Sequence, residues 1–180
     1  MEQTYAIELK NITKRFGKIV ANDGINLKVK RGEILSLLGE NGSGKTTLMN
    51  MISGIYFPDE GRILVDGKAV SIRSPKDSFD LGIGMIHQHF KLIDVMTAAE
   101  NIILGLKGNA VLDMKKVHKD IQELVDRYGF DLDPAQKVYT MSVSQKQTVE
   151  IVKMLYRGAN ILILDEPTAV LTPQEVDKLF

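Results

Sequence analysis

A short glycine-rich loop carrying a lysine and two threonines most constrains what this chain can fold into. Residues 39–47 read GENGSGKTT and lie between an apolar run at 34–38 and a helix-like stretch at 48–52. The glycines let the backbone curl until its N–H groups surround a phosphate, and the helix that follows points its positive end at the same anion. Lys45 adds a mobile positive charge, and the Thr46 hydroxyl can ligate Mg²⁺. The pattern predicts binding of a nucleoside triphosphate; the alternative is an ordinary glycine-rich connection between strand and helix.

Length and composition set broad limits. The 180 residues, 44% of them hydrophobic, can bury one core with room for a satellite lobe. Lys and Arg together number 23, as do Asp and Glu, so net charge offers no argument for nucleic acid or an anionic membrane surface. Cysteine is absent, which excludes disulfides and thiolate metal sites and fits a reducing compartment. No apolar run approaches the ~18 residues of a membrane span, so we expect a soluble chain that reaches membranes through a partner.

Strand signals dominate the first third of the chain. Residues 6–12 and 25–30 alternate apolar with polar side chains, which is typical of antiparallel strands with one solvated face. Residues 63–65 and 68–70 flank Asp66-Gly67, which predicts a hairpin. Three nearly continuous apolar runs, at 34–38, 83–86 and 161–164, predict the buried strands of a parallel core.

Helix signals dominate residues 89–158. Thr97 and Glu100 form a capping-box pattern, and residues 114–128 and 144–156 are periodic in the manner of helices. They predict a helical insertion between core strands. A second capping-box pattern at 172–175 predicts another helix start.

Two further features complete a site for a triphosphate. Asp165 follows the apolar run 161–164 and can hold Mg²⁺ beside Thr46, while Glu166 can polarise the attacking water. The alternative is a strand that ends in two solvated acids. The ring of Phe16 can stack on adenine or, alternatively, belong to the core. The chain has no Asn-Lys-x-Asp tetrapeptide for guanine, which argues against a GTPase.

Together these motifs resemble those of the nucleotide-binding subunits of ABC transporters, in the same order and over nearly the whole chain. By that resemblance, residues 39–46 match the Walker A loop, Gln88 the Q-loop glutamine, and residues 169–172 the D-loop. The implied nucleotide-binding residues are Phe16, Gly39, Glu40, Asn41, Gly42, Ser43, Gly44, Lys45, Thr46 and Thr47, the implied metal ligands Thr46, Gln88 and Asp165, and the implied catalytic residues Glu166 and Gln88. Residues 83–90 and 165–175 look most like ATP-binding proteins of bacterial importers for simple sugars and nucleosides.

The resemblance implies a fold and a division of the chain. The fold is α/β, of the P-loop NTPase (RecA-like) type: a mainly parallel sheet core with an N-terminal antiparallel β subdomain and an inserted helical subdomain, truncated at the C-terminus. Residues 1–88 are expected to form the nucleotide-binding core with the β subdomain, 89–158 the helical subdomain, and 159–180 the return to the core.

The resemblance also implies partners and a mechanism. Two modules sandwich two ATP molecules with Mg²⁺, so each γ-phosphate meets one module's Walker A loop and the other's signature loop. The expected partners are a second nucleotide-binding module, integral membrane permease subunits and, indirectly, a solute-binding protein; no nucleic acid is expected. The expected location is peripheral, at the cytoplasmic face of the cell membrane. The alternatives are a soluble ABC-type ATPase acting on ribosomes or DNA, and a non-catalytic nucleotide-binding fragment.

The chain departs from the family in two places. The signature loop, Ser142, Val143, Ser144 and Gln145, carries Ser144 where the family has glycine, so it is expected to serve the opposite ATP poorly. A serine there would be strained if the position required a positive φ. The family's switch histidine is missing, since all three histidines precede Asp165, so the isolated chain is expected to bind Mg-ATP and hydrolyse it very slowly.

Overall fold

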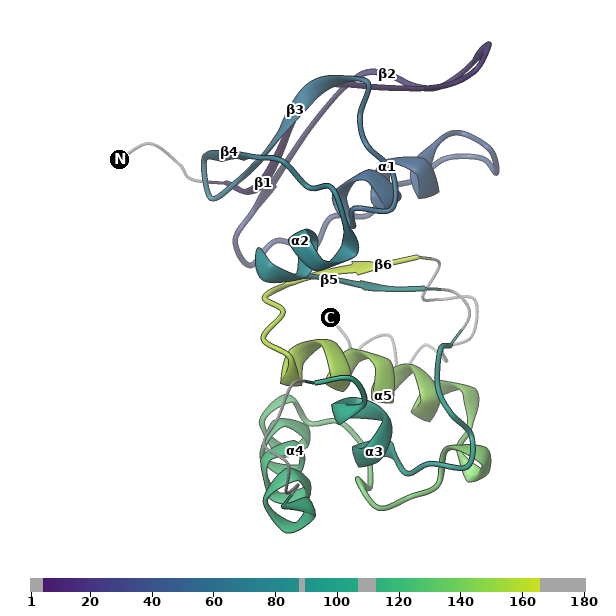
Figure 1. The fold of residues 1–180 in the computed structure, drawn as a ribbon, viewed down its shortest axis with the longest axis vertical. Helices are drawn as coiled ribbons and strands as arrows, with labels where there is room; N and C mark the ends of the chain where they lie inside the picture. The colour runs from purple at the N-terminus through teal and green to yellow at the C-terminus, as the bar shows by residue number, and fades with distance from the viewer. Residues whose placement is uncertain (1–4, 88–89, 107–112, 166–180) are drawn as a thin grey trace. The chain divides into compact units, whose positions relative to one another are not determined.

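The computed structural model describes residues 5–87, 90–106 and 113–165. The chain divides into two compact units, Met1–Gly84 and Met85–Phe180. Figure 1 labels the helices and strands of both units. Within the described ranges, no helix is long and apolar enough to cross a membrane.

An antiparallel sheet with the strand order β2-β1-β3-β4 dominates the first unit (Figure 1). Its strands are β1 (Tyr5–Phe16), β2 (Ile19–Lys30), β3 (Glu60–Val65) and β4 (Lys68–Val70). From residue 25 to residue 30, β2 alternates between half-buried and exposed side chains, as predicted for a strand with one solvated face.

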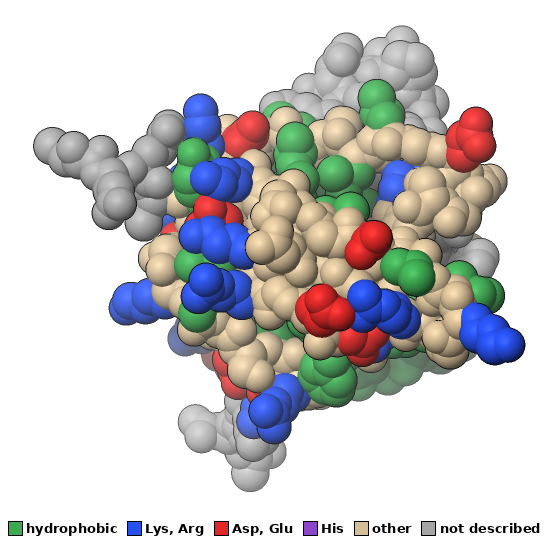
Figure 2. All heavy atoms as spheres, turned by 90° about the horizontal axis from the view of Figure 1, so that it is seen from above, with side chains coloured by type: hydrophobic (Ala, Val, Ile, Leu, Met, Phe, Trp, Pro, Cys, Tyr) green, Lys and Arg blue, Asp and Glu red, His purple; other side chains and the backbone are tan. Residues whose placement is uncertain are grey.

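The predicted hairpin between β3 and β4 is confirmed. Val65 pairs with Lys68, and the two turn residues both have positive φ, 49° at Asp66 and 76° at Gly67. Positive φ at both central residues defines the turn that matches the twist of paired strands. Figure 2 shows basic and acidic side chains lying among apolar ones on the face seen from above. An ion pair joins Arg31, just after β2, to Asp66 in the turn between β3 and β4.

Two helices accompany this sheet in the first unit. Helix α1 (Lys45–Ile52) buries Leu48, Met51 and Ile52. Helix α2 (Pro75–Asp80) begins after Ser74, whose side chain accepts a hydrogen bond from the Asp77 N–H. The Ser78 hydroxyl donates to the Ile52 carbonyl oxygen at 3.0 Å, which fastens α2 to the end of α1.

Strands β5 (Ile83–Ile86) and β6 (Ile161–Leu164) form a parallel two-stranded sheet. The Asp165 N–H donates to the Ile86 carbonyl oxygen at 3.2 Å, so the carboxyl ends of both strands meet at one edge. Two of the three apolar runs predicted as core strands are therefore confirmed as strands.

The third predicted core strand, residues 34–38, is wrong for this structure. Residues 33–40 are described and form no strand, and Ile34 and Leu38 are 59% and 94% exposed. A strand needs a neighbour to satisfy its backbone N–H and C=O groups, and none of the described strands pairs with this run. An apolar run indicates that a segment tends to be buried, but it does not show whether another strand lies beside it to form the hydrogen bonds.

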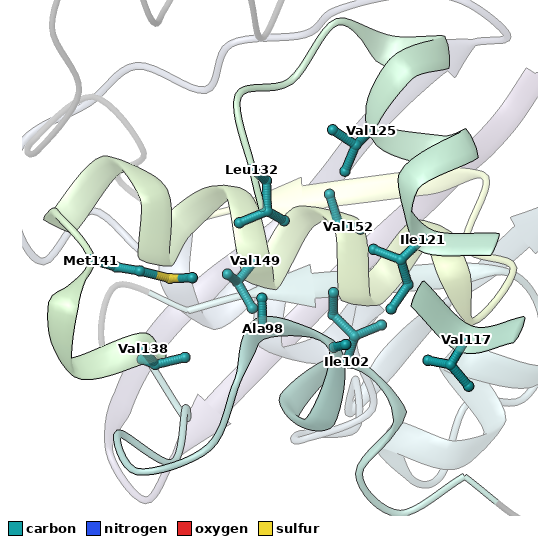
Figure 3. Packing of buried hydrophobic residues seen from close by; sticks show 11 residues of the cluster. Ala98, Ile102, Val117, Ile121, Val125, Leu132, Val138, Met141, Val149 and Val152 are labelled. Atoms are coloured by element: carbon teal, nitrogen blue, oxygen red, sulfur yellow. The ribbon is translucent and has the colours of Figure 1, made fainter. Parts of the chain in front are cut away.

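The second unit is mainly helical and has its own apolar cluster (Figure 3). It contains α3 (Ala98–Ile103), α4 (Met114–Tyr128), the short 3₁₀ helix η1 (Val138–Thr140) and α5 (Val143–Tyr156). Val117, Ile121 and Val125 recur every four residues along α4 and face the valines of α5 (Figure 3). The predicted helices at 114–128 and 144–156 are confirmed, α5 beginning one residue earlier.

The predicted capping box at the start of α3 is confirmed. The Thr97 side chain accepts from the Glu100 N–H at 3.1 Å, and the Glu100 carboxylate accepts from the Thr97 N–H at 2.6 Å. The second predicted capping box, at 172–175, lies outside the described residues.

Candidate functional site

The predicted phosphate loop ends directly in helix α1. Gly44 is the N-cap of α1 with a φ of 92°, and it offers no side chain to the first-turn N–H groups. Such groups have no partner within a helix and carry its positive dipole end, so they suit an anion. A Cβ on Gly44 would collide with the carbonyl oxygen of Ala21 in β2. Glycine is therefore required at 44 by both its backbone angle and the close approach of β2.

The Lys45 ammonium is bound to its own loop. It donates to the carbonyl oxygens of Gly39 at 2.7 Å and Glu40 at 2.9 Å, and the Ser43 hydroxyl oxygen lies 3.5 Å away. An ammonium has three donors on a flexible stem, so it can exchange these oxygens for those of a phosphate. Thr46, the proposed Mg²⁺ ligand, is exposed in the first turn of α1.

Asn22 supports this loop and was missed by sequence reasoning. Its side chain is buried in β2, and its Nδ2 donates to the Gly44 carbonyl oxygen at 3.3 Å. Its Oδ1 has no hydrogen-bond partner among the described residues. Asn22 precedes the predicted strand 25–30 and belongs to no motif, so no local pattern pointed to this contact.

The ring of Phe16 lies at the exposed end of β1 instead of in the core. It is 41% exposed and meets the Tyr56 ring edge-on, with centroids 5.2 Å apart and planes at 73°. The Lys14 ammonium lies over the Phe16 ring, 5.5 Å from its centroid. Sequence reasoning missed Tyr56 and Lys14, because neither belongs to a motif. The exposed ring leaves aromatic surface for a base.

The predicted acidic and Q-loop residues belong to the second unit. Asp165 directly follows β6, and its N–H donates a hydrogen bond to the Ile86 carbonyl oxygen. Burial lowers the pKa of His87; Lys91 lowers it further, while Asp165 and Glu150 oppose the shift. Gln88 and Glu166 lie outside the described residues. Thr46 belongs to the first unit, so its shared Mg²⁺ site with Asp165 stays a prediction.

The signature loop forms the start of α5. Ser142 is the N-cap: its side chain accepts from the Gln145 N–H at 3.2 Å, and the Gln145 side chain accepts from the Ser142 N–H at 3.0 Å. This capping box occupies the N–H groups of Ser142 and Gln145, so those two donors are not available to an anion. The donors that remain for an anion at the start of α5 are the N–H groups of Val143 and Ser144 and the Ser142 hydroxyl.

Ser144 is not strained. Among the described residues, the only non-glycine residues with positive φ are Asn11 and Asp66. Ser144 lies in the first turn of α5, and its carbonyl oxygen accepts from the Thr148 hydroxyl at 3.2 Å. The serine therefore differs from glycine here by its hydroxymethyl group and not by backbone strain.

The loop, the aromatic ring at the end of β1 and the two-unit fold define a nucleotide-binding cassette. Residues 22–169 match the family model for the ABC transporter, and the chain belongs to that family. It is 55% identical to the guanosine import ATP-binding protein NupO of Bacillus subtilis, over 97% of this chain and 35% of that protein. It is 53% identical to the nucleoside import ATP-binding protein NupA of Lactococcus lactis, over 99% of this chain and 36% of that protein. The chain thus spans about a third of these curated relatives.

Solved structures share the fold. The structure of cbiO1 from Clostridium perfringens, part of the ABC transporter complex cbiONQ, is 31% identical with a TM-score of 0.81, over 98% of this chain and 71% of that one. The dimeric ABC transporter cassette MJ0796 is 30% identical with a TM-score of 0.76, over 96% of this chain and 79% of that one. The predicted family and α/β fold class are confirmed.

Proposed function

We propose that this chain is the nucleotide-binding part of an ATPase subunit that energises import of a nucleoside or simple sugar. The observation that carries the proposal is the geometry of the loop 39–47. Within it, left-handed Gly44 is the N-cap of α1, and the Lys45 ammonium donates hydrogen bonds to the loop's own carbonyl oxygens. The relatives named for guanosine and nucleoside import support the same class of cargo.

The nucleotide in this proposal is ATP. Its phosphates would bind the N–H groups of residues 39–47, and its base would stack on Phe16. Thr46, Gln88 and Asp165 would hold Mg²⁺, and Glu166 would polarise the attacking water. Bound Mg²⁺ would neutralise charge on the β- and γ-phosphates.

Hydrolysis in this proposal takes place between two modules. The start of α5, from Ser142 to Gln145, would face the γ-phosphate of an ATP held by the second nucleotide-binding module. The dimeric structure of MJ0796 supports such an arrangement. Permease subunits would bind the modules at the cytoplasmic face of the membrane, with the solute-binding protein on the other side.

Nucleotide binding by the purified chain tests the proposal directly. We expect Mg-ATP binding by titration calorimetry, and loss of at least tenfold in affinity for Lys45→Ala, because the variant lacks the loop's mobile cation. Lys18→Ala is the matched control, since Lys18 is exposed in the turn between β1 and β2. Equal affinities for the Lys45 variant and the wild type would overturn the proposed site.

A further inference from the structure

The segment after α1 returns to the end of β1. The N–H groups of Ile55 and Tyr56 both donate to the Asn50 carbonyl oxygen, at 2.9 and 3.1 Å, so the end of α1 sets the place of Tyr56. Three residues later the Asp59 N–H donates to the Thr13 carbonyl oxygen of β1 at 2.8 Å. One short segment is therefore fastened to the helix of the phosphate loop and to the strand that bears Phe16.

Asp59 also fixes the position of Lys14. One carboxylate oxygen accepts from the Lys14 ammonium at 2.9 Å, and the other accepts from the Arg15 N–H at 2.6 Å. The Lys14 side chain is only 14% exposed. Its ammonium is held over the Phe16 ring at 5.5 Å, within the range of a cation–π interaction.

These contacts fix the position of Phe16 and leave part of the residue exposed. Tyr56 packs against the ring edge-to-face, and Lys14 covers one face with a positive charge. The quadrupole of the ring attracts the ammonium, so the fixed Lys14 in turn helps to fix the position of the ring. Yet 41% of Phe16 stays exposed, so aromatic surface remains for a base.

We propose that Tyr56 and the Lys14–Asp59 pair are positioning residues that hold Phe16 as a platform for a purine base. They would determine how much better the site binds ATP than an equally charged phosphate chain without a base. This inference rests on the proposed role of Phe16 in nucleotide binding. Tyr56 acts through Phe16 and is not itself a catalytic residue.

The test compares the affinity of the purified chain for ATP with its affinity for inorganic tripolyphosphate, both measured by calorimetry with Mg²⁺. We expect Tyr56→Leu to lower the ratio of these affinities about three- to tenfold, as loss of an aromatic pair would, with tripolyphosphate binding unchanged. Tyr56→Phe should keep the wild-type ratio, because it retains the ring. Tyr139→Leu, the same change at a 65% exposed tyrosine of the second unit, is the control.

Asp59→Asn provides a second variant that alters charge without removing a ring. It should lower the ratio in the same direction, because Lys14 loses the carboxylate that holds it. A wild-type ratio in both Tyr56→Leu and Asp59→Asn would overturn the inference, as would an equal loss of affinity for both ligands. Phe16→Ala separates the two proposals: an unchanged ratio there removes the proposed role of Phe16 itself.

Discussion

The amide of Asn22 in β2 donates to the carbonyl oxygen of Gly44 at the start of α1, at 3.3 Å. The same strand passes so close to Gly44 that a Cβ there would strike the Ala21 carbonyl oxygen. Strand β2 therefore packs directly against the phosphate loop at Gly44. This packing fixes the position of the first turn of α1, whose N–H groups can then bind an anion.

Gly44→Ala should abolish nucleotide binding. Alanine at a φ of 92° is strained by about 1 kcal/mol, and its Cβ also pushes the loop from β2. Gly17→Ala is the control, because Gly17 has a φ of 59° and no atom near its Cβ position. Both variants carry the strain of a positive φ, and Gly44→Ala loses further stability through the contact with β2; only Gly44→Ala should lose ATP affinity in a calorimetric titration. Wild-type affinity in Gly44→Ala would contradict the close packing.

Thr97→Ala should destabilise the second unit by about 1 kcal/mol, the usual effect of removing an N-cap. The threonine accepts from the Glu100 N–H at the start of α3, whose Ala98, Ala99 and Ile102 belong to the apolar cluster. Urea denaturation measures the change, and Thr97→Ser should restore most of it because it keeps the hydroxyl. Equal stability of the alanine and serine variants would contradict the cap.

Stability should depend on pH through Glu100. The hydrogen bond from the Thr97 N–H, aided by Lys137, lowers the pKa of Glu100 below its ordinary 4.5. Because the folded-state pKa is the lower one, the contribution is present above 4.5 and is lost as pH falls through the folded-state value. The slope of unfolding free energy against pH should therefore flatten in Glu100→Gln. A slope as steep in Glu100→Gln as in the wild type would contradict this role of Glu100.

Ser144→Gly should raise ATPase turnover in the assembled transporter. In the proposed arrangement, removing the hydroxymethyl group from the first turn of α5 would let the γ-phosphate of the second module's ATP approach the backbone more closely. Glycine should also weaken the helix by about 0.5 kcal/mol relative to serine, so turnover is normalised to folded protein. Ser144→Ala keeps a Cβ and should give a smaller increase. Unchanged turnover in the glycine variant would rule out crowding at this position.

Local patterns were enough for much of the fold. The hairpin at Asp66-Gly67, the capping box at Thr97 and helices α4 and α5 were predicted, because each depends on residues close together along the chain. The phosphate loop was predicted in the same way, since its three glycines and Lys45 lie within residues 39–45; its binding of a nucleotide stays a prediction. The resemblance to the ABC transporter family, read from the order of the motifs, agrees with the family match over residues 22–169.

By itself the sequence determined the type of most elements, because dihedral preferences and side-chain periodicity act over a few residues. It also predicted the phosphate-binding chemistry of the loop. The tertiary structure decided the contacts made across long separations. Asp59 meets Arg15 from 44 residues away, and Asn22 meets Gly44 from 22 residues away. It also left the run 34–38 without a strand partner, which no local pattern could show. Partners of this kind are selected by the packing of the whole unit, so the support of Phe16 and of the loop became visible only there.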